Sequence, residues 1–111
     1  MKWIDLTNSA QLAEIKAASL NRPQVIFKHS TRCSISVMAK SRLDRSADIP
    51  EMDFYYLDLL SYRSVSQEIA ELFQVHHESP QVLLIQQGAC IYDESHNAIL
   101  IDDILEQAGL N

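Results

Sequence analysis

Apolar residues recur along the chain in two patterns, one typical of strands and one typical of amphipathic helices. Short segments rich in leucine, β-branched and aromatic residues predict strands over 2–6, 24–29, 54–60, 81–85 and 90–93. Between them, apolar residues spaced three and four apart predict helices over 9–20, 34–45 and 99–108, and another from residue 64. Strands therefore alternate with helices until a final pair of strands and a last helix.

Residues at the predicted helix ends support these boundaries. Asn8 and Ser9 are favourable caps for the first helix. Ser64 and Gln67 match a capping box at the start of the third helix. Gly109 follows the last helix, at a position where glycine commonly ends one.

The order of the predicted elements is β-α-β-α-β-α-β-β-α, in one domain that spans residues 1–111. We expect strands separated by a single helix to run parallel through right-handed crossovers. The sequence "QQGA" supplies a tight turn with Gly88, which makes the last two strands an antiparallel hairpin. The prediction is an α/β fold: a thioredoxin-like three-layer α/β/α sandwich with a mixed, mainly parallel central sheet and a C-terminal antiparallel hairpin.

The composition is that of one globular domain and excludes several classes of protein. Its 47% of hydrophobic residues form no run long enough to cross a membrane, and Asp5 comes too early for a signal-peptide core. Two cysteines, Cys33 and Cys90, are too few for the disulfide framework of a small secreted domain. With two glycines, a glycine-rich phosphate loop is disfavoured. We therefore expect a cytoplasmic protein with no membrane partner.

Basic residues gather around the first cysteine, although the chain carries a net charge of −6. Residues 22–45 hold six basic residues and one acidic residue. Two interpretations stay open: an exposed helix face rich in lysine and arginine, or electropositive surroundings for Cys33. The net charge and the lack of aromatic residues among the basic ones disfavour nucleic acid as a partner.

Cys33 lies in "HSTRCSIS", between a predicted strand and a predicted helix. Ligands in open α/β sheets bind beyond the carboxyl ends of strands, where a helix begins with unpaired N–H groups. Such a position stabilises a thiolate, the reactive form of cysteine, and Lys28, His29 and Arg32 would add positive potential. A buried, inert cysteine is the alternative. The polar residues directly before and after Cys33 disfavour it.

Other residues with chemical potential have structural interpretations. Cys90 lies between Ala89 and Ile91 in a predicted strand, the setting of a small core residue. His76 and His77 are adjacent, so they cannot bind one ion as an i, i+4 pair on a helix would, and we interpret them as surface residues at a helix end. The ligands of a zinc site are missing, so no metal is expected.

The segments "STRCSIS", "HHESPQVLLI" and "YDESHNAIL" together resemble the single-cysteine, bacilliredoxin-like proteins of the bacillithiol redox system, which have a thioredoxin fold. The resemblance covers nearly the whole chain. The family's active-site pattern is Thr-x-Cys-Pro-Ile-Ser, and the matching residues are Thr31, Cys33, Ile35 and Ser36. Ser34 stands where the family usually has proline.

Two further segments match the family. Ser79 and Pro80 match the segment that in thioredoxin-like folds is the cis-proline loop facing the cysteine. Few X–Pro bonds are cis, so the sequence alone favours trans and the cis bond is an expectation from the resemblance. Ser95 and His96 also match, whereas Leu100 replaces a threonine that caps the last helix in the family.

The resemblance implies thiol–disulfide exchange by one cysteine. Cys33 would attack a mixed disulfide between a protein and a small anionic thiol such as bacillithiol, and take the small thiol onto itself. Ser36 stands at the position of a resolving cysteine, so an external thiol would complete the reaction, and its hydroxyl could donate a hydrogen bond to the Cys33 sulfur. The supporting residues of the expected site are Thr31, Arg32, Ser34, Ser36, Ser79 and Pro80.

The implied partners are S-thiolated proteins and a small anionic thiol, which acts as co-substrate, and no tightly bound cofactor is expected. The basic surroundings of Cys33 suit an anionic thiol. The backbone beside Pro80 would pair with the main chain of a protein substrate.

Two other functions stay open. A single-cysteine glutaredoxin would use glutathione or hold an iron–sulfur cluster, but such proteins carry a Cys-Gly-Phe-Ser pattern and a Gly-Gly pair after the fourth strand. Here Cys33 is followed by Ser-Ile-Ser, and residues 93–98 read "DESHNA". The other alternative is a thioredoxin-like binding module or stress-response adaptor with an incidental cysteine.

Overall fold

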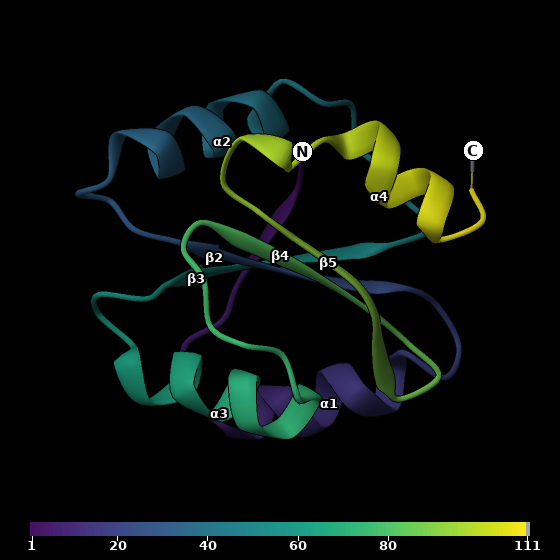
Figure 1. The fold of residues 1–111 in the computed structure, drawn as a ribbon. Helices are drawn as coiled ribbons and strands as arrows, with labels where there is room; N and C mark the ends of the chain where they lie inside the picture. The colour runs from purple at the N-terminus through teal and green to yellow at the C-terminus, as the bar shows by residue number, and fades with distance from the viewer. Residues whose placement is uncertain (111) are drawn as a thin grey trace.

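The computed structural model describes residues 1–110 and shows a five-stranded sheet with helices on both faces (Figure 1). The strands are β1 (Trp3–Asp5), β2 (Gln24–His29), β3 (Asp53–Asp58), β4 (Gln81–Gln86) and β5 (Ala89–Ser95). The helices are α1 (Ala10–Ala18), α2 (Ser34–Asp44), α3 (Arg63–Phe73) and α4 (Ile101–Gln107), with a short 3-10 helix, η1 (His96–Ala98), before α4. None of the helices in this range is long and apolar enough to cross a membrane.

The predicted three-layer sandwich is confirmed: α1 and α3 cover one face of the sheet, and α2 and α4 cover the other (Figure 1). Every residue of β2 is buried, as expected for a central strand. Alternate residues of a strand point to opposite faces. Ile26 packs in the core cluster on the α1/α3 face, whereas Val25 and Phe27 pack in the cluster on the α2/α4 face. The same alternation places Lys28 on the α1/α3 face and His29 on the α2/α4 face.

The strand order is β1-β3-β2-β4-β5, with two parallel and two antiparallel pairs, so the sheet is evenly mixed rather than mainly parallel. The prediction that strands joined through one helix run parallel is wrong for β4, which is antiparallel to β2. The reason is the segment 74–80 after α3. An extended chain advances about 3.3 Å per residue, whereas a helix rises only about 1.5 Å per residue, so this short segment can span the length of α3. It carries the chain back to the edge where β2 ends, and β4 begins there.

The helix boundaries agree with the predicted ones within a few residues, but the capping box of the third helix is wrong. α3 begins directly after Tyr62, so Ser64 lies inside the helix and makes no side-chain cap with Gln67. The Asp58 carboxylate organises the preceding turn instead and accepts a hydrogen bond from the Leu60 N–H at 3.2 Å.

The other predicted helix ends are confirmed in part. Asn8 Oδ1 accepts a hydrogen bond from the Gln11 N–H at 3.2 Å, while the Ser9 hydroxyl donates to Glu68 rather than to its own helix. α4 starts two residues later than predicted, because η1 and two extended residues come before it. Gly109 follows α4 with a left-handed φ of 78°, as a glycine that ends a helix commonly does.

The hairpin between β4 and β5 is confirmed. Gln87 and Gly88 have left-handed φ values of 53° and 80°. Two such residues in a row fit a type I′ turn, whose twist matches that of the antiparallel strands on either side. β5 is longer than predicted and runs to Ser95, which brings the following residues to the edge where β2 ends.

Candidate active site

Cys33 lies where the sequence predicts it, between β2 and α2, as the N-cap residue of α2. Its carbonyl accepts the first helical hydrogen bond from the Val37 N–H at 3.0 Å, and its side chain is partly exposed. The first turn of α2, all of it within residues 1–110, contains no acidic residue. The positive end of the helix dipole therefore acts on the sulfur without an opposing charge in that turn.

Ser36 is fully buried, and its hydroxyl bonds the scaffold of the site. Its Oγ lies 2.7 Å from His29 Nδ1 and accepts a hydrogen bond from the Ser30 N–H at 2.9 Å. The expected hydrogen bond to the Cys33 sulfur is not formed within the described residues, because the hydroxyl lies between these two partners on the inner side of the loop. Ser36 therefore fixes the loop that carries the cysteine.

The basic residues expected around Cys33 are arranged differently from the prediction. Burial lowers the pKa of His29, and the nearby Lys40 lowers it further, so the imidazole favours its neutral form. Lys28 is fully buried on the opposite face of the sheet, where burial lowers its pKa to about 8. Arg32, next to Cys33 in the chain, is the one of the three expected cations that is exposed.

The segment before β4 lies at the same edge of the sheet as the cysteine. Gln81 pairs directly with Lys28 between β4 and β2, so Pro80 comes next to the end of β2. The Ser79–Pro80 peptide bond is cis, as the resemblance implied. The Pro80 carbonyl accepts a hydrogen bond from the His96 N–H at 3.0 Å. The loops that follow β2, precede β4 and follow β5 thus meet at one edge.

The remaining predicted site residues differ in exposure. Thr31 and Ser34 are exposed on either side of the Arg32–Cys33 pair. Ser79 is partly buried, and its Oγ is shielded from solvent without a hydrogen-bond partner in the described part of the chain. Thr31 and Ser34 are therefore the exposed hydroxyl-bearing residues among those predicted for the site.

The exposure of apolar side chains on α2, the helix that follows Cys33, is not apparent from the sequence. The spacing on α2 predicts one buried face formed by Ile35, Met38, Ala39 and Leu43. The structure buries Ala39 and Leu43 but leaves Ile35 39% exposed and Met38 58% exposed. The buried polar Ser36 takes the place on the inner face that the pattern gives to an apolar residue. The signal in the sequence that could have indicated this arrangement is the polar Ser36 itself, in the first turn of the helix and three positions after Cys33.

Cys90 contrasts with Cys33. It packs against the core on the α1/α3 face, and its Sγ–H donates to the Tyr92 carbonyl at 3.3 Å. Burial raises the pKa of the Cys90 thiol to about 11. The interpretation of Cys90 as a small core residue is confirmed, although the side chain is partly rather than fully buried.

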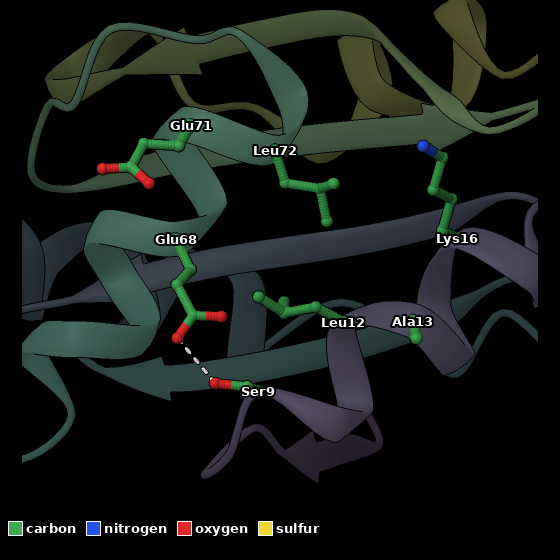
Figure 2. A pocket seen from close by; sticks show the side chains of 7 residues that line it. All are labelled: Ser9, Leu12, Ala13, Lys16, Glu68, Glu71 and Leu72. Atoms are coloured by element: carbon green, nitrogen blue, oxygen red, sulfur yellow. Dashed lines mark hydrogen bonds between the residues drawn. The ribbon is translucent and has the colours of Figure 1, made fainter.

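A groove of about 510 Å³ lies between α1 and α3 (Figure 2). Its lining residues come from these two helices and from the residue directly before α1, and they are Ser9, Leu12, Ala13, Lys16, Glu68, Glu71 and Leu72. Across it, the Ser9 hydroxyl donates to the Glu68 carboxylate at 2.6 Å (Figure 2). Neither Cys33 nor Pro80 belongs to this lining, so the groove is separate from the candidate active site. Over residues 1–110 no cluster of three or more histidine, cysteine and acidic residues could hold a metal ion.

A cysteine at a helix start beside a cis-proline, on a mixed sheet of this order, is the arrangement of thioredoxin-fold proteins, and solved structures agree. A candidate oxidoreductase with a thioredoxin fold is 28% identical, with a TM-score of 0.83 over 95% of this chain and 92% of that chain. A thioredoxin from Nicotiana alata shares the fold at 24% identity, with a TM-score of 0.75 over 96% and 92%. The Malassezia sympodialis thioredoxin Mala s 13 does so at 16% identity, with a TM-score of 0.77 over 97% and 91%.

The family follows from the sequence. Residues 4–104 match the family model described as monothiol bacilliredoxin BrxC. The match covers most of the chain, so the protein belongs to the monothiol bacilliredoxin family, which confirms the resemblance. Family and fold together assign a thiol–disulfide redox role.

Proposed function

We propose that this protein removes bacillithiol from mixed disulfides on other proteins, with Cys33 as the catalytic residue. The observation that carries the proposal is a contrast within the first turn of α2. Cys33 is accessible at the helix start, whereas Ser36, at the resolving position, is buried and bonded to the loop. Cys33 can attack a disulfide, but Ser36 is not a second thiol that could resolve the product. The reaction then begins on Cys33 and ends with a thiol from outside the chain.

The proposed reaction has two exchange steps. In the first, the Cys33 thiolate attacks the bacillithiol sulfur of the mixed disulfide, the original sulfur–sulfur bond breaks, and the substrate protein leaves as a thiolate that takes up a proton. In the second, the thiolate of another bacillithiol attacks the bacillithiol sulfur bound to Cys33. Bacillithiol disulfide leaves, and the Cys33 thiolate is restored. We place this cycle in the cytoplasm, where small thiols keep cysteine residues reduced.

The exposed residues next to Cys33 support recognition of the small thiol. The Arg32 guanidinium is exposed and carries a permanent positive charge, which suits the carboxylates of an anionic thiol. Thr31 and Ser34 offer hydroxyl groups to the same side. We infer that these residues bind the part of bacillithiol that lies beyond its sulfur.

A protein substrate needs a larger surface. The apolar side chains of Ile35 and Met38 are exposed on α2, the helix that follows Cys33. Exposed apolar side chains of this kind contribute to protein contacts. Ser79 and Pro80 bring the backbone before β4 to the same edge, where it could pair with the main chain of the substrate. We infer that the substrate chain lies between these two elements during the first step.

Intact-mass analysis tests the proposal. The wild-type protein, Cys33→Ala and Cys90→Ala are each mixed with bacillithiol disulfide and, separately, with glutathione disulfide. One bacillithiol adduct is expected on the wild type and on Cys90→Ala, and none on Cys33→Ala. A bacillithiolated test protein should then lose its adduct when the wild type and reduced bacillithiol are added.

Three results would contradict the proposal. An adduct that persists in Cys33→Ala would assign the chemistry to the wrong residue. Faster adduct formation with glutathione disulfide would assign the wrong small thiol. A test protein that keeps its bacillithiol in the presence of the wild type would remove the proposed activity.

A further inference from the structure

Lys28 is fully buried although its side chain carries an ammonium group. Burying such a charge is unfavourable unless it is well paired. Within the described residues, its one hydrogen-bond partner is His77 Nδ1, at 3.3 Å. The two exchange steps proposed above make no direct use of Lys28, which points away from α2. The presence of a lysine at this position therefore needs another explanation.

Lys28 has a matching neighbour on the next strand. Gln81 is also fully buried and is the direct partner of Lys28 in the β2–β4 pairing. Gln81 Nε2 donates to the His76 carbonyl at 3.0 Å, and Gln81 Oε1 accepts from the Glu78 N–H at 3.4 Å. Lys28 contacts His77, the residue between these two. We call this pair, Lys28 and Gln81, the polar clamp under residues 76–78.

The clamped residues lead directly into the cis-proline loop. The segment 75–80 belongs to no helix or strand, so it lacks the backbone ladder that fixes its neighbours. After the clamp, the next bond in this loop is the one from the His96 N–H to the Pro80 carbonyl. The polar clamp on one side and His96 on the other thus hold the loop that carries Pro80, directly before β4.

We propose that Lys28 is a positioning residue for protein substrates: through His77 it holds the loop at Pro80 where a substrate chain pairs beside Cys33. The inference rests on the function proposed above and divides its two steps. The first step requires a protein to lie along the loop, and the second requires only a small thiol at the sulfur. Loss of the clamp should therefore slow the first step and leave the second unchanged.

A lysine in this role has a signature that a purely structural residue lacks. Methionine fills a similar volume, and replacing a buried charge with a well-packed apolar side chain is often neutral or stabilising. Lys28→Met should therefore melt at the same temperature as the wild type or higher, yet be less active on proteins. A side chain that only supports the fold would lower both the melting temperature and the activity.

The experiment compares Lys28→Met with the wild type and with Gln24→Met. Gln24 is the matched control, because it is a fully buried polar residue on the same strand and face, at the opposite end of β2, where it bonds Asp53. For Lys28→Met, kcat/KM on a bacillithiolated protein should fall about tenfold or more, mainly through KM. The rate at which bacillithiol disulfide reacts with Cys33 should not change. Gln24→Met should keep kcat/KM within about twofold of the wild type.

A second measurement follows the loop itself. Hydrogen exchange of the Glu78 amide reports on its bond to Gln81, and it should be faster in Lys28→Met while exchange within β2 and β4 is unchanged. His77→Gln keeps a hydrogen-bond acceptor for Lys28 and should retain most of the activity. His77→Leu removes the acceptor and should resemble Lys28→Met.

The outcomes separate this inference from the proposed function. A wild type that does not release bacillithiol from proteins would overturn both. An active wild type, with Lys28→Met equal to it in kcat/KM and in Glu78 exchange, would overturn the inference alone. A loss of activity in Lys28→Met that comes with a lower melting temperature and a slower reaction with bacillithiol disulfide would show a structural role.

Discussion

The two cysteines show how position in one fold decides what a thiol can do. Cys33 lies at a junction between strand and helix, partly exposed, at the positive end of the α2 dipole. Cys90 lies within β5, against the core, with its Sγ–H bonded to the Tyr92 carbonyl and its pKa raised to about 11. The same chemical group is partly exposed at a helix start in one place, whereas in the other it lies where burial raises its pKa.

The surroundings of Cys33 are set by the backbone more than by neighbouring charges. Of the three cations expected around Cys33, Lys28 lies on the opposite face of the sheet and His29 favours its neutral form. At the start of α2, the first backbone N–H groups have no partner within the helix, and the first turn has no acidic side chain. Arg32 is exposed directly before Cys33 in the chain.

The largest expected effect separates the two cysteines in catalysis. Cys33→Ala should lower the rate of bacillithiol release from a test protein to that of the uncatalysed exchange, because no other accessible thiol replaces it. Cys90→Ala should retain most of the wild-type rate. Single-turnover assays with a fluorescent bacillithiolated protein measure both, and comparable losses in the two variants would erase the contrast.

A pH titration of stability tests the buried face that Cys90 shares with Lys28. The pKa of Lys28 is lowered from 10.5 to about 8, so the folded state binds fewer protons than the unfolded state in that range and stability rises with pH by up to about 3 kcal/mol. The pKa of Cys90 is raised from 9.0 to about 11, so its effect has the opposite sign between those values.

The two variants should therefore differ in opposite directions from the wild type. In chemical denaturation between pH 8 and pH 10.5, Lys28→Met should lack the rise in unfolding free energy. Cys90→Ala should lack the fall between pH 9 and pH 11. Curves for all three proteins that stay parallel over this range would show that neither group is perturbed by burial.

Removal of the Ser36 hydroxyl tests whether this side chain holds the Cys33 loop. Ser36→Ala leaves the Ser30 N–H and His29 Nδ1 without their partner, which should cost about 1–3 kcal/mol in unfolding free energy and slow the alkylation of Cys33. Ser34→Ala, an exposed change in the same turn, should stay within about 0.5 kcal/mol of the wild type. Equal stabilities for the two variants would argue against the loop being held by Ser36.

The smallest expected effect comes from restoring the family's proline. Ser34 is the first residue of α2, where proline fits well, and Cys33 before it has the extended conformation that a following proline requires, with φ −106° and ψ 120°. Ser34→Pro should raise the unfolding free energy by about 0.5–1 kcal/mol. A lower stability would mean that Cys33 and Ser34 do not have the extended and first-helical conformations that a proline at position 34 requires.

Much of the fold could be predicted because burial on both faces leaves a clear pattern. The run Val25, Ile26 and Phe27 specifies a central strand, and the break before Cys33 specifies where a helix begins. The direction of β4 could not be predicted, because it depends on how far the segment 74–80 returns along α3. Sequence spacing alone does not fix that path.

The site could be predicted at the level of its backbone but not of its side chains. The position of Cys33 could be predicted from element boundaries, and that of the cis-proline Pro80 from the resemblance. The partners of Ser36 and Lys28 depend on which face each side chain points to, and a shift of one residue exchanges the two faces. The apolar spacing of α2 also predicts that Ile35 faces the core. In the structure Ile35 is exposed, and the polar Ser36 faces the core instead.

The most direct test of the central claim is competitive alkylation of the folded, reduced protein with iodoacetamide at pH 7, with each cysteine followed by peptide mass analysis. Cys33 should react fully while Cys90 remains unmodified, since a thiol with a pKa of about 11 is ionised in roughly one molecule in ten thousand at that pH. Modification of Cys90 at a rate equal to or greater than that of Cys33 would contradict it.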